Sequence, residues 1–279
     1  MPSATQQPAP RPAPPQLPVA LTLAGSDSGA GAGIQADLLA FAANDVYGAT
    51  AITCLTAQNP DGVSAVIPLP PSFVLEQARQ VARYFTLDAL KTGMLLNREI
   101  IAATATFIRE QRGRNPRIPL VLDPVMVATS GARLLDPDAV ASLLGELFPL
   151  ATLLTPNLDE AATLLGKPAA TTATEMFADA RALRKKFGAD ILLKGGHLPS
   201  SHLRDILVAR NGAEHVFHAQ RHPDANTHGS GCTLAAAIAA QLAHRKPLPD
   251  AVAAAHAYLQ AGMHSPIGAG GHGFIAHFP

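Results

Sequence analysis

Short apolar runs alternate with longer segments of helical periodicity from Val19 onward. The runs cover residues 19–23, 49–55, 89–92, 120–122, 152–155 and 191–193, and Gly, Asp, Asn or Pro soon follows. Such runs are typical of strands buried on both faces of a parallel sheet. Helices are expected after the glycines at 29–33 and over residues 72–84, 98–112, 136–147 and 175–187. This succession predicts a layered α/β domain with a central, mostly parallel sheet.

Three further patterns refine the predicted elements. Residues 205–208 and 216–218, separated by Asn211-Gly212, predict a hairpin added to the sheet. Thr172 and Glu175 match a capping box, so the basic residues 184–186 of that helix are expected largely in solvent. Residues 231–244 predict an Ala-rich helix suited to close packing.

The domain organisation follows from composition. Residues 1–18 contain seven prolines and few large apolar side chains, which predicts an extended or disordered tail. No later change in composition marks a second domain. A single domain over residues 19–279 is therefore expected.

Charge and cysteine content narrow the function classes. The chain has 279 residues, 48% of them hydrophobic, and 21 basic residues balance 21 acidic ones. A net charge of zero disfavours nucleic-acid and membrane-surface partners and favours a small-molecule ligand. The two cysteines, Cys54 and Cys232, indicate a reducing compartment. Without a long apolar span or a secretory signal, we expect a cytoplasmic protein.

A glycine-rich loop at residues 25–33 follows the first predicted strand. Its four glycines and two hydroxyls at a strand end suit a ligand-binding loop, although a flexible turn is the alternative. Ile34 occupies the last glycine position of a dinucleotide fingerprint, and no Gly-Lys-Ser/Thr ending is present. Dinucleotide and P-loop readings are therefore disfavoured.

A second loop, residues 226–233, leads directly into the Ala-rich helix. Its glycines and the positive end of the helix dipole predict an anion hole. Cys232 would lie at the helix N-terminus, where the pKa of a thiol is expected to be lowered. A buried structural thiol is the alternative for Cys232 and the preferred reading for Cys54.

Polar residues also stand at other predicted strand ends. Asp123 and Glu160 are candidate Mg²⁺ ligands, with Asn157 between them in sequence and Lys194 as a cation for phosphate oxygens. Helix capping by Glu160 and a structural salt bridge of Lys194 are the competing readings. Gln58 offers both a donor and an acceptor to an amino-substituted heterocycle. The eleven histidines show no metal-binding spacing.

Seven collinear motifs carry a family resemblance. They are AGSDSGAGAGIQAD (24–37), TAQN (56–59), KTGML (91–95), LDPVMVATSG (122–131), TPNLDEA (155–161), LLKGGH (192–197) and NTHGSGCT (226–233). With them the chain resembles the hydroxymethylpyrimidine and phosphomethylpyrimidine kinases of thiamine biosynthesis, in the ribokinase-like superfamily. The resemblance implies a three-layer fold, ATP with Mg²⁺, two successive phosphorylations and a homodimer.

The resemblance also implies roles for individual residues. It places the pyrimidine among Gln58, Met94, Val125 and the loop residues Gly25, Asp27 and Ala32. It places Asp123 and Glu160 at the metal, and Lys194, Asn157 and Thr227 at the nucleotide. The catalytic group would be Lys194 together with Gly229, Ser230, Gly231 and Cys232, where Cys232 acts as the base. Ala30, Thr129, Ala132 and Ser230 depart from the family pattern.

Two alternatives to this function remain at this point. A pyridoxal kinase of the same superfamily would share the anion hole and phosphorylate a hydroxymethyl group on a heteroaromatic ring. A silent pyrimidine-binding module would bind the ligand without turnover.

Overall fold

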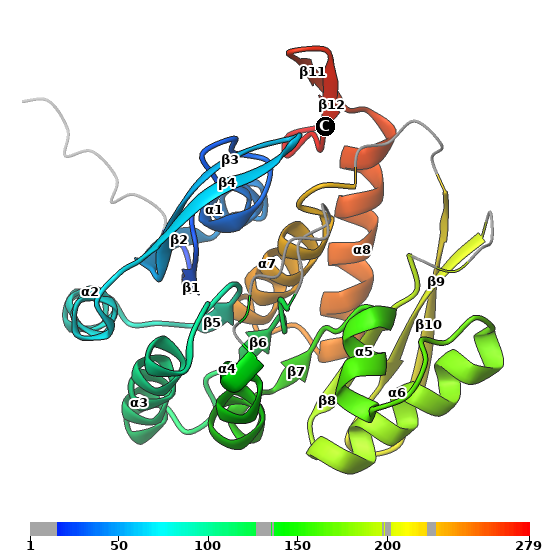
Figure 1. The fold of residues 1–279 in the computed structure, drawn as a ribbon, viewed down its shortest axis with the longest axis horizontal. Helices are drawn as coiled ribbons and strands as arrows, with labels where there is room; N and C mark the ends of the chain where they lie inside the picture. Colours follow the sequence, from blue (N-terminus) through cyan, green and yellow to red (C-terminus); the bar gives the residue numbers. More distant parts are fainter. Residues whose placement is uncertain (1–15, 127–134, 136, 197, 199–201, 222–226) are drawn as a thin grey trace, which may run out of the picture.

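A mixed eight-stranded sheet forms the centre of the protein (Figure 1). The computed structural model describes residues 16–126, 135, 137–196, 198, 202–221 and 227–279. The strand order is β10-β9-β8-β7-β6-β5-β1-β2, and only the pairings of β9 with β8 and β10 are antiparallel. The strands are β1 (Val19–Ala24), β2 (Tyr47–Ile52), β5 (Ala89–Thr92), β6 (Leu120–Leu122), β7 (Leu153–Leu154), β8 (Asp190–Lys194), β9 (His202–Val208) and β10 (Glu214–Gln220).

Alternate residues of each strand enter different cores. In β1, Ala20 faces one core while Leu21 and Leu23 face the other, as the two-residue period of a strand requires. The core containing Ala20 lies under α1 (Gly33–Ala43), α7 (Ser230–Ala243) and α8 (Leu248–His264). The opposite core lies under α2 (Pro71–Tyr84), α3 (Arg98–Arg114), α4 (Pro137–Ser142), α5 (Leu158–Leu165) and α6 (Ala173–Phe187). The predicted three-layer α/β fold is therefore confirmed.

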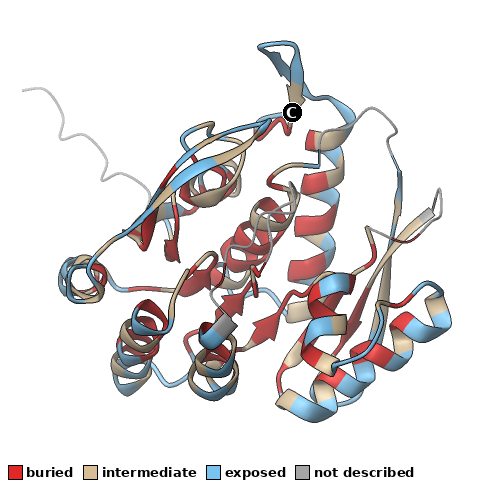
Figure 2. Ribbon diagram, in the orientation of Figure 1, coloured by how far each residue is buried: buried red, intermediate tan, exposed pale blue. Residues whose placement is uncertain are grey.

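Helix α7 is the most deeply buried helix of the fold (Figure 2). Its alanines allow the helix to pack closely between the sheet and both α1 and α8. The outer helices instead show a buried face and an exposed face, as amphipathic helices do (Figure 2). The N-terminus of α7 is thereby fixed at the carboxyl edge of the sheet.

The structure corrects one predicted strand. The run 49–55 is divided at Thr53, so that β2 stays in the main sheet and β3 (Cys54–Asn59) leaves it. β3 pairs with β4 (Gly62–Pro68) as a separate two-stranded arm. The hydroxyl of Thr53 donates to the carbonyl of Met94 (2.7 Å), which anchors the chain where it changes sheets.

Other elements refine or extend the sequence predictions. The hairpin predicted around Asn211-Gly212 is present and longer than expected, as β9 and β10. Capping boxes begin both α5 and α6, at Asn157 and Thr172. Helix α4 continues as a wider π-helical turn (Leu143–Leu147) and a 3₁₀ turn (Phe148–Leu150). Helix α8 and the hairpin of β11 (Ile267–Ala269) and β12 (His272–Phe274) had no sequence prediction.

Candidate active site

A cavity of about 680 Å³ lies at the carboxyl edge of the parallel strands. Ligands bind at this edge in open α/β sheets, where loops and helix N-termini surround the strand ends. Every candidate residue from the sequence lines this cavity. These residues are Gly25, Asp27, Ala32, Gln58, Met94, Asp123, Val125, Asn157, Glu160, Lys194, Thr227, Gly229, Ser230, Gly231 and Cys232.

Asp27 organises the glycine-rich loop from within. Its carboxylate accepts the backbone N–H groups of Gly29 (2.8 Å) and Ala32 (2.9 Å). The same carboxylate lies 2.9 Å from Nε2 of His228 in the anion-hole loop. Burial raises the pKa of Asp27, but the hydrogen bonds from His228 and the two amides more than offset this, so its pKa lies below the ordinary value. Asp27 thus ties the two ligand loops together.

Ala30, one of the departures from the family pattern, has a positive φ of 62°. This left-handed conformation costs a residue with a side chain about 1–2 kcal/mol, whereas glycine adopts it freely. The alanine at this position therefore strains the glycine-rich loop. Thr129 and Ala132, two other departures, lie outside the described residues.

Gly229 allows the start of α7 to approach the glycine-rich loop. Gly229 has a φ of 77°, and a Cβ placed on it would lie 1.8 Å from the carbonyl oxygen of Gly31. No side chain fits in that space. The backbone of Gly229, Ser230 and Gly231 is therefore presented to the cavity at the positive end of a helix, as the anion-hole prediction requires.

Cys232 lies in the first turn of α7, but its ionisation differs from the sequence expectation. Burial raises the pKa of the thiol to about 11. The positive charge of Lys91 and a hydrogen bond from the backbone N–H of Gly33 act in the opposite direction without offsetting burial. The predicted lowering of the pKa was wrong because it considered the helix dipole and not the desolvation of the sulfur. Cys54 is a buried thiol, as expected.

Asp123 and Lys194 form an ion pair between the ends of β6 and β8. Nζ of Lys194 lies 2.9 Å from Oδ1 of Asp123, which also accepts the hydroxyl of Thr155 at 3.0 Å. Burial lowers the pKa of Lys194, but Asp123 and Glu160 more than offset this and raise it. A Cβ on Gly231 would lie 3.2 Å from Nζ of Lys194. The ammonium therefore lies beside the backbone of the predicted anion hole, and the salt bridge given as the competing interpretation is present.

Glu160 combines a capping role with a place in the cavity. Its carboxylate accepts the backbone N–H of Asn157 (2.8 Å), and the side chain of Asn157 accepts the N–H of Glu160 (2.9 Å). Burial, with a further contribution from the negative charge of Asp123, raises the pKa of Glu160 to about 7. Two carboxylates that repel each other in a buried site match the donor set that Mg²⁺ prefers. The chemistry of these residues fits the ion.

Gln58 reaches the cavity from the arm formed by β3 and β4. Its backbone exchanges hydrogen bonds with the hydroxyl of Ser28 (both 2.7 Å), which joins the arm to the glycine-rich loop. Its amide nitrogen lies 3.4 Å from Nε2 of His228. The arm therefore delivers Gln58 to the same point as Asp27 and His228.

The structure adds residues for which the sequence reasoning gave no role. Lys91 and His228 line the cavity, and both belong to motifs that carried the resemblance. A further wall comes from β9, β10 and α8, through Leu203, Asp205, Ala219, Arg221, His256, Leu259, Gln260 and Met263. No signal in the sequence marked this wall, because its residues are dispersed and α8 was not predicted.

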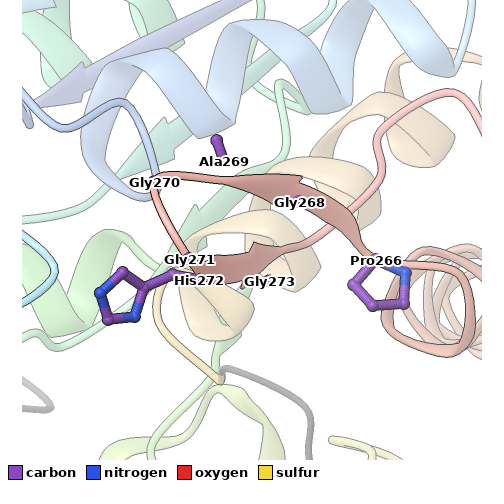
Figure 3. A pocket seen from close by; sticks show the side chains of 7 residues that line it. All are labelled: Pro266, Gly268, Ala269, Gly270, Gly271, His272 and Gly273. Carbon is purple, nitrogen blue, oxygen red and sulfur yellow. The ribbon is translucent and has the colours of Figure 1, made fainter.

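A hollow under the β11–β12 hairpin is lined mainly by glycine backbone, with the rings of Pro266 and His272 at its sides (Figure 3). Among the described residues of its lining, His272 is the one side chain that could act as an acid, a base or a ligand. Within the described ranges, no group of three His, Cys, Asp or Glu residues is placed to hold a metal ion, and no helix is long and apolar enough to cross a membrane.

Comparison with known proteins agrees with the geometry. The family model of phosphomethylpyrimidine kinases matches residues 27–276. The hydroxymethylpyrimidine/phosphomethylpyrimidine kinase of Rhizobium meliloti is 46% identical over 232 residues, which span 83% of this chain and 85% of that protein.

Two solved structures share the fold. The phosphomethylpyrimidine kinase of Clostridium difficile has a TM-score of 0.74 and 36% identity, covering 86% of this chain and 97% of its own. An ADP complex of Bacillus subtilis pyridoxal kinase has a TM-score of 0.84 and 33% identity, covering 94% of this chain and 98% of its own. Backbone similarity therefore does not separate the two activities. The family match and the 46% identity favour the phosphomethylpyrimidine kinases. The chain belongs to that family, whose kinase activity in thiamine biosynthesis the resemblance implied.

Proposed function

We propose that the protein transfers the γ-phosphoryl group of ATP to the hydroxymethyl oxygen of hydroxymethylpyrimidine, and then transfers a second one to the monophosphate. The main support for the proposal is that candidate residues from all seven sequence motifs line one cavity, beside the N-terminus of α7. The ADP complex of the similar pyridoxal kinase supports the use of an adenine nucleotide.

The pyrimidine would bind between the glycine-rich loop and the arm. Gln58, Met94 and Val125 line this side of the cavity with Gly25, Asp27 and Ala32. An amide recognises an aminopyrimidine edge through a paired donor and acceptor. The Asp27 carboxylate accepts hydrogen bonds from backbone N–H groups of the glycine-rich loop, so its role is to fix the conformation of that loop.

The phosphoryl group would transfer at the start of α7. The amides of Gly229, Ser230 and Gly231 and the Lys194 ammonium would stabilise the charge on the group in flight. Cys232 would accept the proton of the hydroxymethyl oxygen in the first transfer, which requires its thiolate form. Asn157 and Thr227 would position the nucleotide.

Asp123 and Glu160 are the residues that would hold Mg²⁺, with the phosphate oxygens of ATP completing the ligand set. When bound, the ion neutralises negative charge on the β- and γ-phosphates. The residues of the chain contribute the carboxylates and fix their positions through Thr155 and Asn157.

The substrate assignment is tested with Gln58→Leu. We expect a loss of kcat/KM for hydroxymethylpyrimidine of about tenfold or more, since an unpaired polar edge in a closed site costs about 1–3 kcal/mol. Val63, which pairs with Gln58 on the arm but is absent from the cavity lining, gives the control Val63→Thr. Unchanged turnover of the aminopyrimidine by Gln58→Leu would contradict the assignment and favour a pyridoxal kinase.

We also propose a homodimer and a cytoplasmic location. Large apolar side chains, among them Tyr47, Leu55 and Ile67, are exposed on the edge strand β2 and on the arm. Both cysteines are free, which suits a reducing compartment. Sedimentation velocity tests the dimer, and a monomer at micromolar concentration would contradict it.

A further inference from the structure

Lys91 is a fully buried lysine that the mechanism above leaves without a role. It lies in β5 and begins the KTGML motif. Its Nζ is 2.8 and 2.9 Å from the two carboxylate oxygens of Asp37, and neither side chain is exposed to solvent. Removing two ions from water costs several kcal/mol per ion, and apolar residues of similar volume often serve packing equally well. Packing alone therefore does not explain why a buried ion pair lies beside the cavity.

The surroundings of the pair hold Lys91 in its charged form. The hydroxyl of Thr22 donates to Asp37 at 2.6 Å, so this carboxylate receives hydrogen bonds from both β1 and β5. Burial lowers the pKa of Lys91, but the negative charges of Asp37, Cys232 and Asp123 and the hydrogen bond to Asp37 together more than offset this and raise it. Lys91 is a fixed positive charge at neutral pH.

The ammonium of Lys91 lies beside Gly93, a residue of the cavity wall. A Cβ on Gly93 would lie 2.8 Å from Nζ of Lys91, so the lysine head fills the space beside the end of β5. Lys91 and Cys232 both line the cavity, and α7 packs against β5. The absence of a side chain at Gly93 leaves room for this charge in the wall of the cavity that Cys232 also lines.

Several charged groups face Cys232. Lys91 from β5 and Lys194 from β8 favour the thiolate, whereas Asp37 from α1 and Asp123 after β6 oppose it. After burial, the charge of Lys91 is the largest influence on the pKa of the thiol, and it lowers that pKa. The backbone N–H of Gly33 adds a hydrogen bond to the sulfur.

We propose that Lys91 is a positioning residue that stabilises the thiolate of Cys232, and that Asp37 and Thr22 hold its ammonium in place. Lys91 itself neither gains nor loses a proton. Its charge offsets part of the cost of ionising a buried sulfur, which then receives the proton of the hydroxymethyl oxygen. The inference rests on the proposed function for that last step, whereas the ionisation of the thiol does not depend on it.

The test removes both charges of the pair with Lys91→Met/Asp37→Asn. The full-length protein is alkylated with iodoacetamide across a pH series, and modification of the Cys232 peptide is followed by mass spectrometry. Cys232 lines the cavity, so the reagent approaches it from there. We expect alkylation at pH 9 to slow at least tenfold. A titration of Cys232 identical to that of the unaltered protein would overturn the proposal.

Two further variants separate charge from structure. Lys91→Gln/Asp37→Asn retains hydrogen-bonding side chains and carries the same expectation, which keeps the test decisive if the first variant fails to fold. Lys167→Met/Asp179→Asn removes an ion pair outside the cavity lining and should leave the titration of Cys232 unchanged. If alkylation of Cys232 slows in the Lys91/Asp37 variants but the rates of both phosphoryl transfers fall equally, Lys91 stabilises the thiolate and Cys232 is not the base.

Discussion

At the scale of single residues, the environment decides the chemistry more than the residue type does. Cys232 stands at a helix N-terminus, yet burial raises the pKa of its thiol to about 11. The sequence suggested either a helix cap or a metal ligand for Glu160. Its buried carboxylate caps α5, and Glu160 also lines the cavity where the metal site is proposed. Sequence identifies such residues, but burial and neighbouring charges fix their protonation.

The base assignment predicts a step-selective effect of Cys232→Ala. The first transfer attacks from an alcohol that must lose a proton, whereas the second attacks from a phosphate oxygen that is already anionic. We expect the first rate to fall about 10²-fold or more, the usual contribution of a general base, and the second to change far less. Rapid-quench measurement of each transfer from its own substrate checks this. Equal losses in both transfers would exclude the base role.

The raised pKa of Cys232 predicts a pH dependence for the first transfer. Below a pKa of about 11 the thiolate fraction increases about tenfold per pH unit, so the rate should rise with pH above neutrality. The second transfer, which uses no thiolate, should lack this rise. Cys232→Ala provides the control, because its residual first transfer should lose the slope. A flat profile in the unaltered enzyme would contradict the account.

At the scale of elements, the site depends on how closely α7 approaches the glycine-rich loop. The sequence located both the loop and the helix, since glycines before an Ala-rich segment are a clear local signal. It missed the arm, because the run 49–55 is continuous in hydrophobicity although β2 ends at Ile52. It also missed the wall formed by β9, β10 and α8, whose residues are brought together only by tertiary packing.

Gly229→Ala tests this close approach. The positive φ alone costs about 1–2 kcal/mol, and the Cβ would overlap the carbonyl oxygen of Gly31, 1.8 Å away. For a domain of this size we expect the melting temperature to fall by about 2–8 °C or more. Both transfers should weaken, because the anion hole serves both.

Gly113→Ala is the matched control, since a Cβ there meets open space and its φ is not positive. Calorimetry and activity measurements on the two variants check the expectation. Equal stability and activity of Gly229→Ala and Gly113→Ala would show that the contact with Gly31 is unimportant.

At the scale of the whole molecule, the fold brings the residues of the proposed site together from the main sheet, its helices and the arm. Its architecture could be predicted because buried strands and amphipathic helices alternate in sequence, and the two faces of β1 confirm the layers. The choice between an aminopyrimidine and a pyridoxal substrate could not be predicted from the fold, since both kinds of kinase share it. That choice rests on side chains such as Gln58.

Deleting residues 1–17 should leave folding and activity intact. In the described chain, Pro18 accepts a hydrogen bond from Tyr47 (2.8 Å) and Val19 donates to Asp88 (2.9 Å), so both anchors are retained. The truncated and full-length proteins are compared by thermal melting and by steady-state kinetics. A clear loss of either stability or turnover would show that the proline-rich segment contributes to the domain.

In the proposed function, one site phosphorylates hydroxymethylpyrimidine twice. The most direct measurement incubates the purified protein with ATP, Mg²⁺ and hydroxymethylpyrimidine, with pyridoxal in a parallel reaction, and follows the products by mass spectrometry over time. We predict that the pyrimidine monophosphate accumulates and is then converted to the diphosphate. Phosphorylation of pyridoxal alone, or binding of the pyrimidine without any phosphorylated product, would contradict the account.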